Sequence, residues 1–256
     1  MDGKPSGTLH AAVLGAMDCE IGRIMGALSG AETLREGSWE LVTGDIGRVR
    51  VTAVRCGIGT ANAAACAALA LLAAKPDLLI IQGTAGAHSP ELRRGDLVLA
   101  ERLVNIGAYM SDTHPEGSGV RTSLWKPFET ELMLAEPRSV YELRSSDELL
   151  AAARVTAEAL REEGRLSGRV ICGTVGSGDI WNRELARIAE LRSVYGTDCE
   201  DMESYSAAQV CASFGVPFLC VRVISNSELT GEEYERETAS AAQDFTLALL
   251  ERLGRS

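Results

Sequence analysis

The sequence predicts an α/β fold, a three-layer sandwich in which helices flank a central mixed β-sheet. Apolar segments of strand length alternate with segments of helical spacing, and one pair of strands is joined by a tight turn, which makes the sheet mixed. The 256 residues suffice for one sizeable core. We therefore expect a single domain over residues 1–256, with residues 1–8 flexible.

The first third of the chain predicts a strand, a helix, a hairpin and a second helix. Residues 9–15 indicate a short buried strand, and residues 16–28 carry apolar side chains at helical spacing. Residues 39–59 alternate apolar and polar side chains around the turn Gly-Asp-Ile-Gly, which is typical of an antiparallel hairpin. Residues 60–76 are rich in Ala and Leu and predict a buried helix that stops at Pro76.

The middle of the chain predicts two further strands and an irregular segment. Residues 77–88 indicate an apolar strand that breaks into a glycine-rich turn, and residues 95–109 another strand. Residues 111–147 show no regular period and suggest an active-site flap or a partner surface.

The last part alternates helices and strands again. Ser146 followed by two acids predicts the start of an amphipathic helix. After it we expect a strand and polar turn, a helix closed by Gly215, a buried strand and a long final helix, over residues 168–185, 200–215, 216–225 and 232–254.

Composition excludes several functions. A net charge of −11 argues against general affinity for nucleic acid or anionic membranes, and no apolar run reaches the ~18 residues of a membrane span. Seven dispersed cysteines without a CxxC pair favour reduced thiols. The three histidines are isolated in the sequence and do not indicate a metal site. No signal peptide is recognisable, so we expect a cytoplasmic protein. We expect neither a metal nor a cofactor.

Small and polar residues follow several predicted strands. Because ligands of open α/β sheets bind at the carboxyl ends of strands, these turns are expected to meet at one site. No phosphate-loop lysine signature and no dinucleotide fingerprint is present. The turns are GAMDCE, CGIG, QGTAGA, GSGDIW and VISN.

An ordered set of motifs over residues 10–252 carries a family resemblance. The chain resembles the purine nucleoside phosphorylase/nucleosidase superfamily, and within it most closely the 5′-methylthioadenosine/S-adenosylhomocysteine nucleosidases. The resemblance implies a nucleoside phosphorylase-like fold and cleavage of the bond between purine N9 and ribose C1′. The motifs are VLGAMDCE, RCGIGTANAAACAA, PDLLIIQGTAGA, RRGDLVLAE, GSGDIW, EDMES and VPFLCVRVISN.

The resemblance also assigns catalytic roles. Glu20 would be the general base on the attacking water, although an acid at a helix start also suits a cap. Arg222, a charge in a buried strand, would pair with Glu20 or Glu203 and help to hold the water. Asn226 ends that strand where the nucleosidases carry Asp.

Further residues are expected to bind the substrate. Met202 and Glu203 match the ribose clamp, while Asp201 is shorter than the usual glutamate there. Trp181 would stack on the purine, or pack in the core instead. The remaining expected contacts are Met17, Ile58, Thr84, Ala85, Gly86, Ile180 and Ser225.

The sequence favours water over phosphate as the nucleophile. The arginines of related phosphorylases are absent from LLIIQGTAG and from AMDCE, and acids near a phosphate would repel it. Arg23 and Arg48 or Arg50 are possible substitutes that nothing in the sequence directs to the site.

Asn226 does not identify the purine of the substrate. An amide cannot transfer a proton near neutral pH, but it can hydrogen-bond either a 6-amino or a 6-oxo substituent. The enzyme can use solvent as the acid for adenine nucleosides, prefer a 6-oxopurine as futalosine hydrolases do, or take the proton from Asp179. The methylthioadenosine type is the first candidate. The alternatives are a 6-oxopurine nucleosidase, a phosphorylase and a non-catalytic purine sensor.

The resemblance implies a homodimer as well, in which a partner segment closes the pocket. Residues 105–130, with Tyr109, Trp125 and Phe128, are the expected contributor. No other partner beyond a small purine nucleoside is expected.

Overall fold

The computed structural model describes residues 7–255. The flexible start expected at residues 1–8 falls mostly on residues 1–6, which lie outside the described part of the chain.

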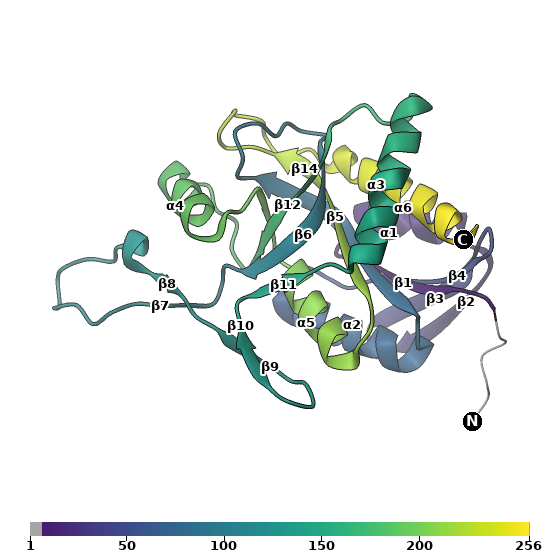
Figure 1. Cartoon of the computed structure of the whole chain (residues 1–256), viewed down its shortest axis with the longest axis horizontal. Coiled ribbons are helices and arrows are strands. Elements are labelled where there is room, and N and C mark those ends of the chain that lie inside the picture. The colour runs from purple at the N-terminus through teal and green to yellow at the C-terminus, as the bar shows by residue number, and fades with distance from the viewer. Residues whose placement is uncertain (1–6, 256) are drawn as a thin grey trace.

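Within residues 7–255, a ten-stranded mixed sheet forms the middle layer, as the sequence predicts (Figure 1). Its order is β11-β6-β12-β13-β5-β1-β4-β3-β2, and β14 pairs with both β5 and β6. The pairs β1–β4, β1–β5 and β14–β5 are parallel, whereas β3–β4 is the expected antiparallel hairpin. The strands are β1 (His10–Gly15), β2 (Ser29–Glu36), β3 (Trp39–Ile46), β4 (Val49–Arg55), β5 (Leu78–Ala87), β6 (Leu97–Asn105), β11 (Glu142–Arg144), β12 (Val170–Ser177), β13 (Cys199–Asp201) and β14 (Phe218–Asn226).

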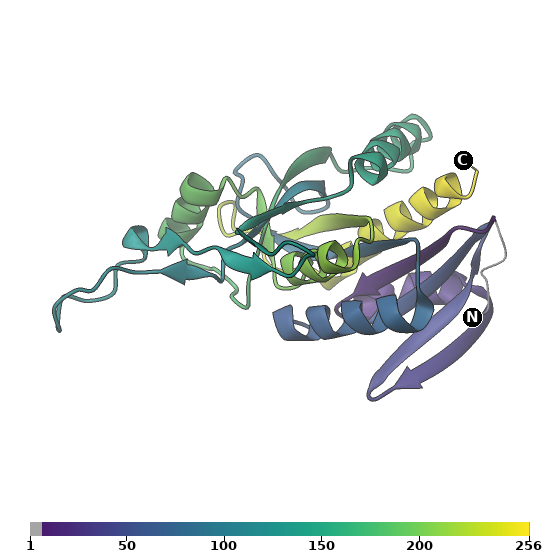
Figure 2. The same cartoon turned by 60° about the horizontal axis from the view of Figure 1, so that its bottom comes forward.

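Helices cover both faces of the sheet and complete the three layers (Figure 2). Ala12 and Leu14 of β1 pack in a core with α2 and α5, while Ala11 and Val13 pack in a second core with α1, α3 and α6. Alternate side chains of one strand thus serve opposite cores, which is why its sequence is continuously apolar. The helices are α1 (Asp18–Ala27), α2 (Thr60–Ala74), α3 (Asp147–Glu162), α4 (Leu185–Tyr195), α5 (Ser204–Phe214) and α6 (Ala239–Leu253), with a 3₁₀ turn η2 (Arg236–Thr238).

Three expectations need correction, and two elements were not expected. Residues 77–88 do not break into a turn, because β5 runs through the glycines to Ala87 and pairs there with β13 and β14. The segment 200–215 begins as strand, and its helix starts only at Ser204. The final helix starts at Ala239, after an irregular segment and η2. Strand β2 and helix α4 were not predicted, since β2 is exposed throughout and no side chain caps the start of α4.

Residues 109–140 form an arm that extends from the sheet (Figures 1 and 2). The irregularity expected for residues 111–147 fits this arm, although it contains two small antiparallel ribbons. Tyr109 and Trp125 stack with ring centroids 4.0 Å apart, and the Arg187 guanidinium lies 5.2 Å from the Trp125 ring centroid. The elements are β7 (Tyr109–Met110), η1 (Thr122–Leu124), β8 (Lys126–Pro127), β9 (Thr130–Leu132) and β10 (Arg138–Val140).

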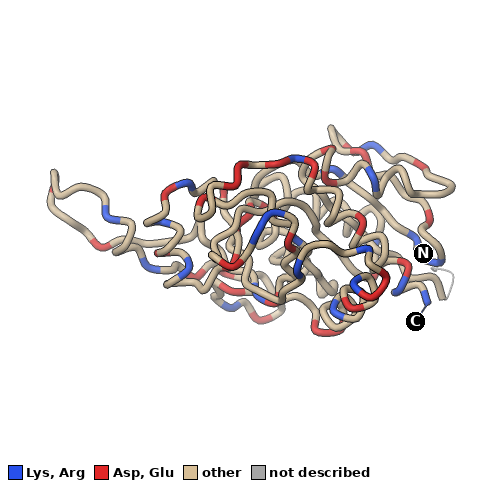
Figure 3. Tube along the Cα trace, turned by 90° about the horizontal axis from the view of Figure 1, so that it is seen from above, with Lys and Arg blue, Asp and Glu red and all other residues tan. Residues whose placement is uncertain are grey.

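Acidic and basic residues are interspersed along the trace (Figure 3). None of the helices in residues 7–255 combines the length and the apolar character needed to cross a bilayer. All seven cysteines are free thiols.

Candidate active site

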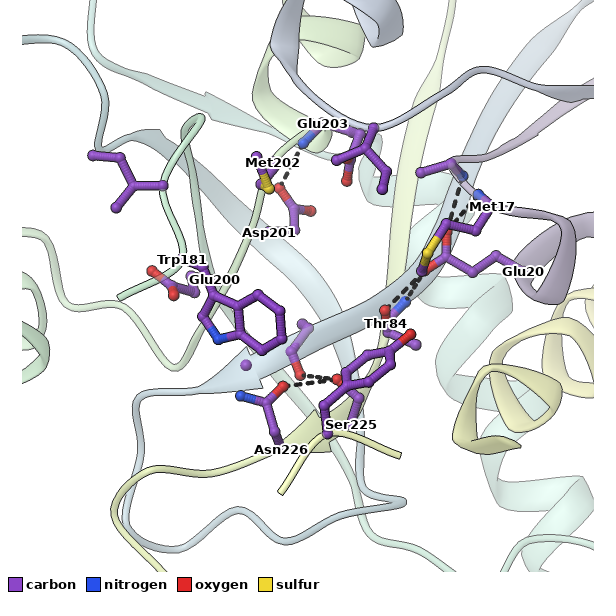
Figure 4. Close-up of a pocket in the computed structure, with 16 residues that line it drawn as sticks. Met17, Glu20, Thr84, Trp181, Glu200, Asp201, Met202, Glu203, Ser225 and Asn226 are labelled. Atoms are coloured by element: carbon purple, nitrogen blue, oxygen red, sulfur yellow. Dashed lines mark hydrogen bonds between the residues drawn. The ribbon is translucent and has the colours of Figure 1, made fainter. Parts of the chain in front are cut away.

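A cavity of about 240 Å³ opens beside the carboxyl ends of β1, β5 and β14 (Figure 4). Every predicted site residue except Arg222 lines it, although these residues come from segments far apart in sequence. Three lining residues were not predicted, namely Ala16, Glu200 and Tyr234. The lining residues are Ala16, Met17, Glu20, Ile58, Thr84, Ala85, Gly86, Ile180, Trp181, Glu200, Asp201, Met202, Glu203, Ser225, Asn226 and Tyr234.

Glu20 is held in place by the start of α1 and by β5. As the third helical residue it folds back, and its Oε2 accepts the backbone N–H groups of Ala16 at 2.9 Å and Met17 at 3.1 Å. Its Oε1 accepts the Thr84 backbone N–H at 2.7 Å and the Thr84 hydroxyl at 2.8 Å. The carboxyl group is buried, and of its four donors only the Thr84 hydroxyl can rotate away. Glu20 is therefore both a helix cap and a group with one replaceable partner.

Gly83 brings Glu20 and Arg222 together across β5. A Cβ at Gly83 would lie 2.6 Å from Arg222 Nη1 and 2.7 Å from Glu20 Oε1. Real Cβ atoms do not approach other atoms that closely, so the site needs glycine here.

Arg222 lies behind the cavity, fully buried, and does not line it. Its Nε is 2.7 Å from Asp201 Oδ2 and its Nη2 is 3.5 Å from Glu203 Oε2. The guanidinium also donates to the Ser204 hydroxyl at 2.9 and 3.1 Å. The expected pairing with Glu203 is present, but Asp201 is the closer partner.

The Asp201 carboxylate is occupied by protein groups. Besides Arg222 it accepts the Ser204 hydroxyl and the backbone N–H groups of Glu203 and Ser204, both at 3.1 Å. These bonds cap α5 and fix Arg222. Asp201 thus borders the cavity but positions other residues.

Glu203 presents its carboxyl group to the cavity at the start of α5. Its Oε1 accepts the Gly59 backbone N–H at 2.9 Å, which ties the group to the loop before α2. Burial raises the pKa of Glu203 from 4.5 to about 7, against the opposing attraction of Arg222. The proton affinity of this carboxyl group therefore falls in the neutral range.

An aromatic and apolar wall lies opposite the acids. Trp181 is 56% exposed, so its ring belongs to the cavity and is not buried in the core. Tyr234 contacts Trp181 edge to face with centroids 5.9 Å apart. Ile58 and Ile180 complete this wall. Tyr234 was not predicted as a site residue, because residues 232–254 were all assigned to the last helix.

Asn226 ends β14 at the far side of the cavity. Its Oδ1 accepts the Ser225 hydroxyl at 2.9 Å, and that hydroxyl is also 3.2 Å from the Ala85 carbonyl oxygen. Figure 4 shows the Asn226 amide nitrogen on the side away from Ser225.

Asp179 does not fill the role of an acid for the base. Its carboxylate accepts the Thr60 backbone N–H at 2.7 Å and the Thr60 hydroxyl at 2.6 Å, and it does not line the cavity. It caps α2 instead, so its position does not support the third explanation for Asn226.

Glu200 is the most informative residue that sequence reasoning missed. It lies in β13, is 5% exposed and lines the cavity. The one available signal was its place beside two other acids in EDMES, next to buried segments.

Four carboxyl groups line the cavity, from Glu20, Glu200, Asp201 and Glu203, while no Lys or Arg does so among residues 7–255. Arg23 pairs with Asp244 at 2.8 Å and Arg50 with Asp45 at 3.5 Å, so neither they nor Arg48 lies where a phosphate would bind. The same part of the chain holds no group of three or more side chains placed to ligate a metal.

The chain belongs to the phosphorylase superfamily, whose family model matches residues 10–254. It is 28% identical over 249 residues to the 5′-methylthioadenosine/S-adenosylhomocysteine nucleosidase of Geobacillus kaustophilus, with 96% of this chain and 97% of that protein covered. These matches confirm the resemblance to nucleosidases.

Solved structures agree on the fold. A nucleosidase of the same name from Colwellia psychrerythraea, in complex with adenine, has a TM-score of 0.78 at 22% identity, over 96% of both chains. A futalosine hydrolase mutant of Helicobacter pylori has a TM-score of 0.75 at 24% identity, over 95% of this chain and 99% of that one. The expected nucleoside phosphorylase-like fold is thereby confirmed.

Proposed function

We propose that the protein is a purine nucleosidase that hydrolyses the N-glycosidic bond of a 5′-modified purine ribonucleoside. The observation that carries this proposal is the set of four carboxyl groups around a cavity that no described Lys or Arg lines. A phosphate dianion would meet repulsion there, whereas a water molecule would meet acceptors and a base.

In the proposed reaction, water attacks C1′ as the bond to N9 breaks. The bonding electrons leave with the purine, which takes up a proton from solvent, and the water proton passes to Glu20 once the Thr84 hydroxyl turns to make room. Arg222 acts as a positioning residue that holds Asp201 and Glu203 in place from outside the cavity.

The Glu203 carboxyl group would accept hydrogen bonds from the 2′ and 3′ hydroxyls. Those bonds strengthen as the sugar acquires positive charge, so they favour the transition state over the ground state. Met17, Ile58 and Met202 would surround the sugar, and Trp181 would stack on the purine.

The names of the relatives make 5′-methylthioadenosine and S-adenosylhomocysteine the first candidate substrates. Asn226 favours a second candidate, a 6-oxopurine nucleoside, because an amide does not supply the proton that a departing adenine needs at N7. The futalosine hydrolase neighbour carries a name from that second class.

Product analysis tests the proposal. Purified protein is incubated with a nucleoside panel with and without inorganic phosphate. Free base and the free 5-modified ribose are expected without phosphate. A ribose 1-phosphate product would identify a phosphorylase, and tight binding without turnover would identify a sensor.

Glu20→Gln tests the assigned base. We expect kcat to fall by about 10²- to 10⁴-fold while nucleoside binding persists, since general-base catalysis contributes about that much. Glu36→Gln, on exposed strand β2, is the matched control. Unchanged turnover of Glu20→Gln would remove Glu20 from the mechanism.

We also propose a homodimer. The arm carries Val120, Phe128 and Met133 with exposed fractions of 81%, 51% and 61%. Apolar side chains gathered on an extended segment are typical of an interaction surface.

A further inference from the structure

We propose that Asp179 is a positioning residue that acts through Thr60 and Gly59 to fix the Glu203 carboxyl group. Asp179 does not line the cavity, so it would touch neither the substrate nor the reacting atoms. The inference rests on the proposed function, in which Glu203 binds the ribose hydroxyls, and it names a residue that keeps this group in place.

The loop before α2 needs support from outside itself. Gly57 and Gly59 have φ angles of 90° and 100°, which glycine adopts far more readily than other residues. Two such glycines in a row of three residues leave the loop with much conformational freedom. Gly59 is the N-cap residue of α2 and has no side chain that could cap the helix. The direction of the Gly59 N–H group is therefore not fixed by the local sequence.

Asp179 supplies that support. Its Oδ1 accepts the Thr60 backbone N–H at 2.7 Å, and its Oδ2 accepts the Thr60 hydroxyl at 2.6 Å. Two bonds to the two carboxylate oxygens fix the orientation of Thr60 as well as its position. With Thr60 held, the Gly59 N–H group donates to Glu203 Oε1 at 2.9 Å.

The hydrogen bonds around Asp179 form a closed circuit. The turn that carries Asp179 is anchored to β13, because the Gly178 N–H donates to the Asp201 carbonyl oxygen at 3.1 Å. Glu203 lies two residues after Asp201, and its N–H donates to the Asp201 carboxylate at 3.1 Å. The circuit thus leaves the end of β13 through Asp179 and returns to Glu203 through the loop before α2.

The same circuit joins two walls of the cavity. Ile58 directly precedes Gly59, Trp181 follows Asp179 by two residues, and both side chains line the cavity. Asp179 therefore ties the aromatic wall to the carboxyl group proposed to bind the sugar.

The Gly59 hydrogen bond acts on the charge of Glu203. Burial raises the pKa of Glu203 to about 7, whereas the attraction of Arg222 and the Gly59 N–H group lower it. The other ionisable groups that act on this carboxyl group are Asp201, Glu20 and Cys56. Loss of the Gly59 bond would raise the pKa of Glu203 further, while loss of a nearby negative charge would lower it. The direction of a shift therefore separates the two effects.

The pH dependence of kcat/KM for 5′-methylthioadenosine tests the inference. Asp179→Ala should lower kcat/KM at neutral pH by about 2- to 30-fold, the equivalent of one lost capping interaction, and should move its rise to higher pH. Asp179→Asn should restore both, because its amide can accept the Thr60 N–H and donate to the Thr60 hydroxyl.

A second measurement needs no substrate. Carbon NMR of isotope-labelled glutamate carboxyl groups follows the titration of Glu203 in the full chain, and Glu203→Gln assigns the resonance. We expect the midpoint to move to higher pH in Asp179→Ala and to stay in place in Asp179→Asn.

Two further variants complete the design. Thr60→Val keeps the shape and the N–H group of Thr60 but loses the hydroxyl bond, so it should give a smaller shift in the same direction. Ser146→Ala is the matched control, because it removes the cap of α3, where the Ser146 side chain accepts the Leu149 N–H. It should lower stability and leave the titration of Glu203 unchanged.

The inference is overturned if the midpoint stays in place or moves to lower pH in a folded Asp179→Ala protein, or if Asp179→Asn or Ser146→Ala shifts it equally. Thr60→Val decides in the same way if Asp179→Ala does not fold. Failure of the proposed function has a different signature, namely no hydrolysis of any nucleoside while the Glu203 resonance still titrates at higher pH in Asp179→Ala.

Discussion

At the scale of single residues, Glu203 illustrates how burial sets the charge of a binding group. Its carboxyl group is desolvated at the start of α5, and Arg222 only partly compensates at 3.5 Å. The ribose clamp proposed for Glu203 accepts hydrogen bonds most strongly when it is ionised, and the burial that shields the group raises the pH at which it ionises.

The raised pKa of Glu203 predicts a pH dependence of activity. Because that pKa is about 7, kcat/KM should rise as pH increases through neutrality, when the carboxyl group ionises in the free enzyme. Initial rates from pH 5 to 9 in one ionic strength measure it. Glu203→Gln should lack this rise as well as most activity, and a flat profile for the unaltered protein would contradict the clamp.

Stability should move in the opposite direction. Between the unfolded value of 4.5 and the folded value of about 7, the folded state holds the extra proton, so this group's contribution to the free energy of unfolding falls as pH rises. Activity and this part of the stability therefore oppose each other over the same interval.

At the scale of elements, β5 is the strand on which the site is built. It supplies Thr84, Ala85 and Gly86 to the cavity, and its Gly83 lets two charged side chains approach each other. Its glycines do not form the turn that the sequence suggested. They are strand residues at which a side chain would crowd neighbouring side chains.

A pair of glycine substitutions tests this. Gly83→Ala should lower the free energy of unfolding by about 1–3 kcal/mol and abolish activity, since its methyl group would displace Arg222 or Glu20. Gly22→Ala, at an exposed position of α1 where an added Cβ would meet no atom within 4 Å, should raise stability by about 0.5–1 kcal/mol. Chemical denaturation of both variants measures the contrast, and equal effects would refute the steric argument.

Elements with strong local signals were predictable from the sequence. The buried strand β14, the helix α2 and the Ser146 cap of α3, which accepts the Leu149 N–H at 3.5 Å, follow from periodicity and capping chemistry. Strand β13 was not, because three residues that include two acids carry no alternation, and their strand state comes from pairing with β5 and β12. Glu200 was missed for the same reason: its place in the cavity wall comes from pairing with Gly86, which is more than 100 residues away in the sequence.

At the scale of the whole molecule, the arm is the part that leaves the layered body (Figure 2). Its stacked Tyr109 and Trp125 give it internal order, while Phe128 remains half exposed. Exposed apolar side chains on an extended segment of this kind suit contact with a second copy of the chain.

Substitution in the arm tests the homodimer. Phe128→Asp should lower the molar mass found by light scattering from that of a dimer to that of one chain, because a charge buried in an apolar interface is costly. Glu116→Gln, in the exposed part of the same arm, should leave it unchanged. A monomer before any substitution would exclude the arm as a dimer contact.

The position of β5, hydrogen-bonded to β1, β13 and β14, has a consequence for how the protein opens. Amide hydrogens in such a strand exchange with solvent only when the entire body unfolds, whereas those of the arm exchange through local fluctuations. We therefore expect the proposed chemistry at the sugar to depend on slowly exchanging backbone, while the arm can move without loosening it.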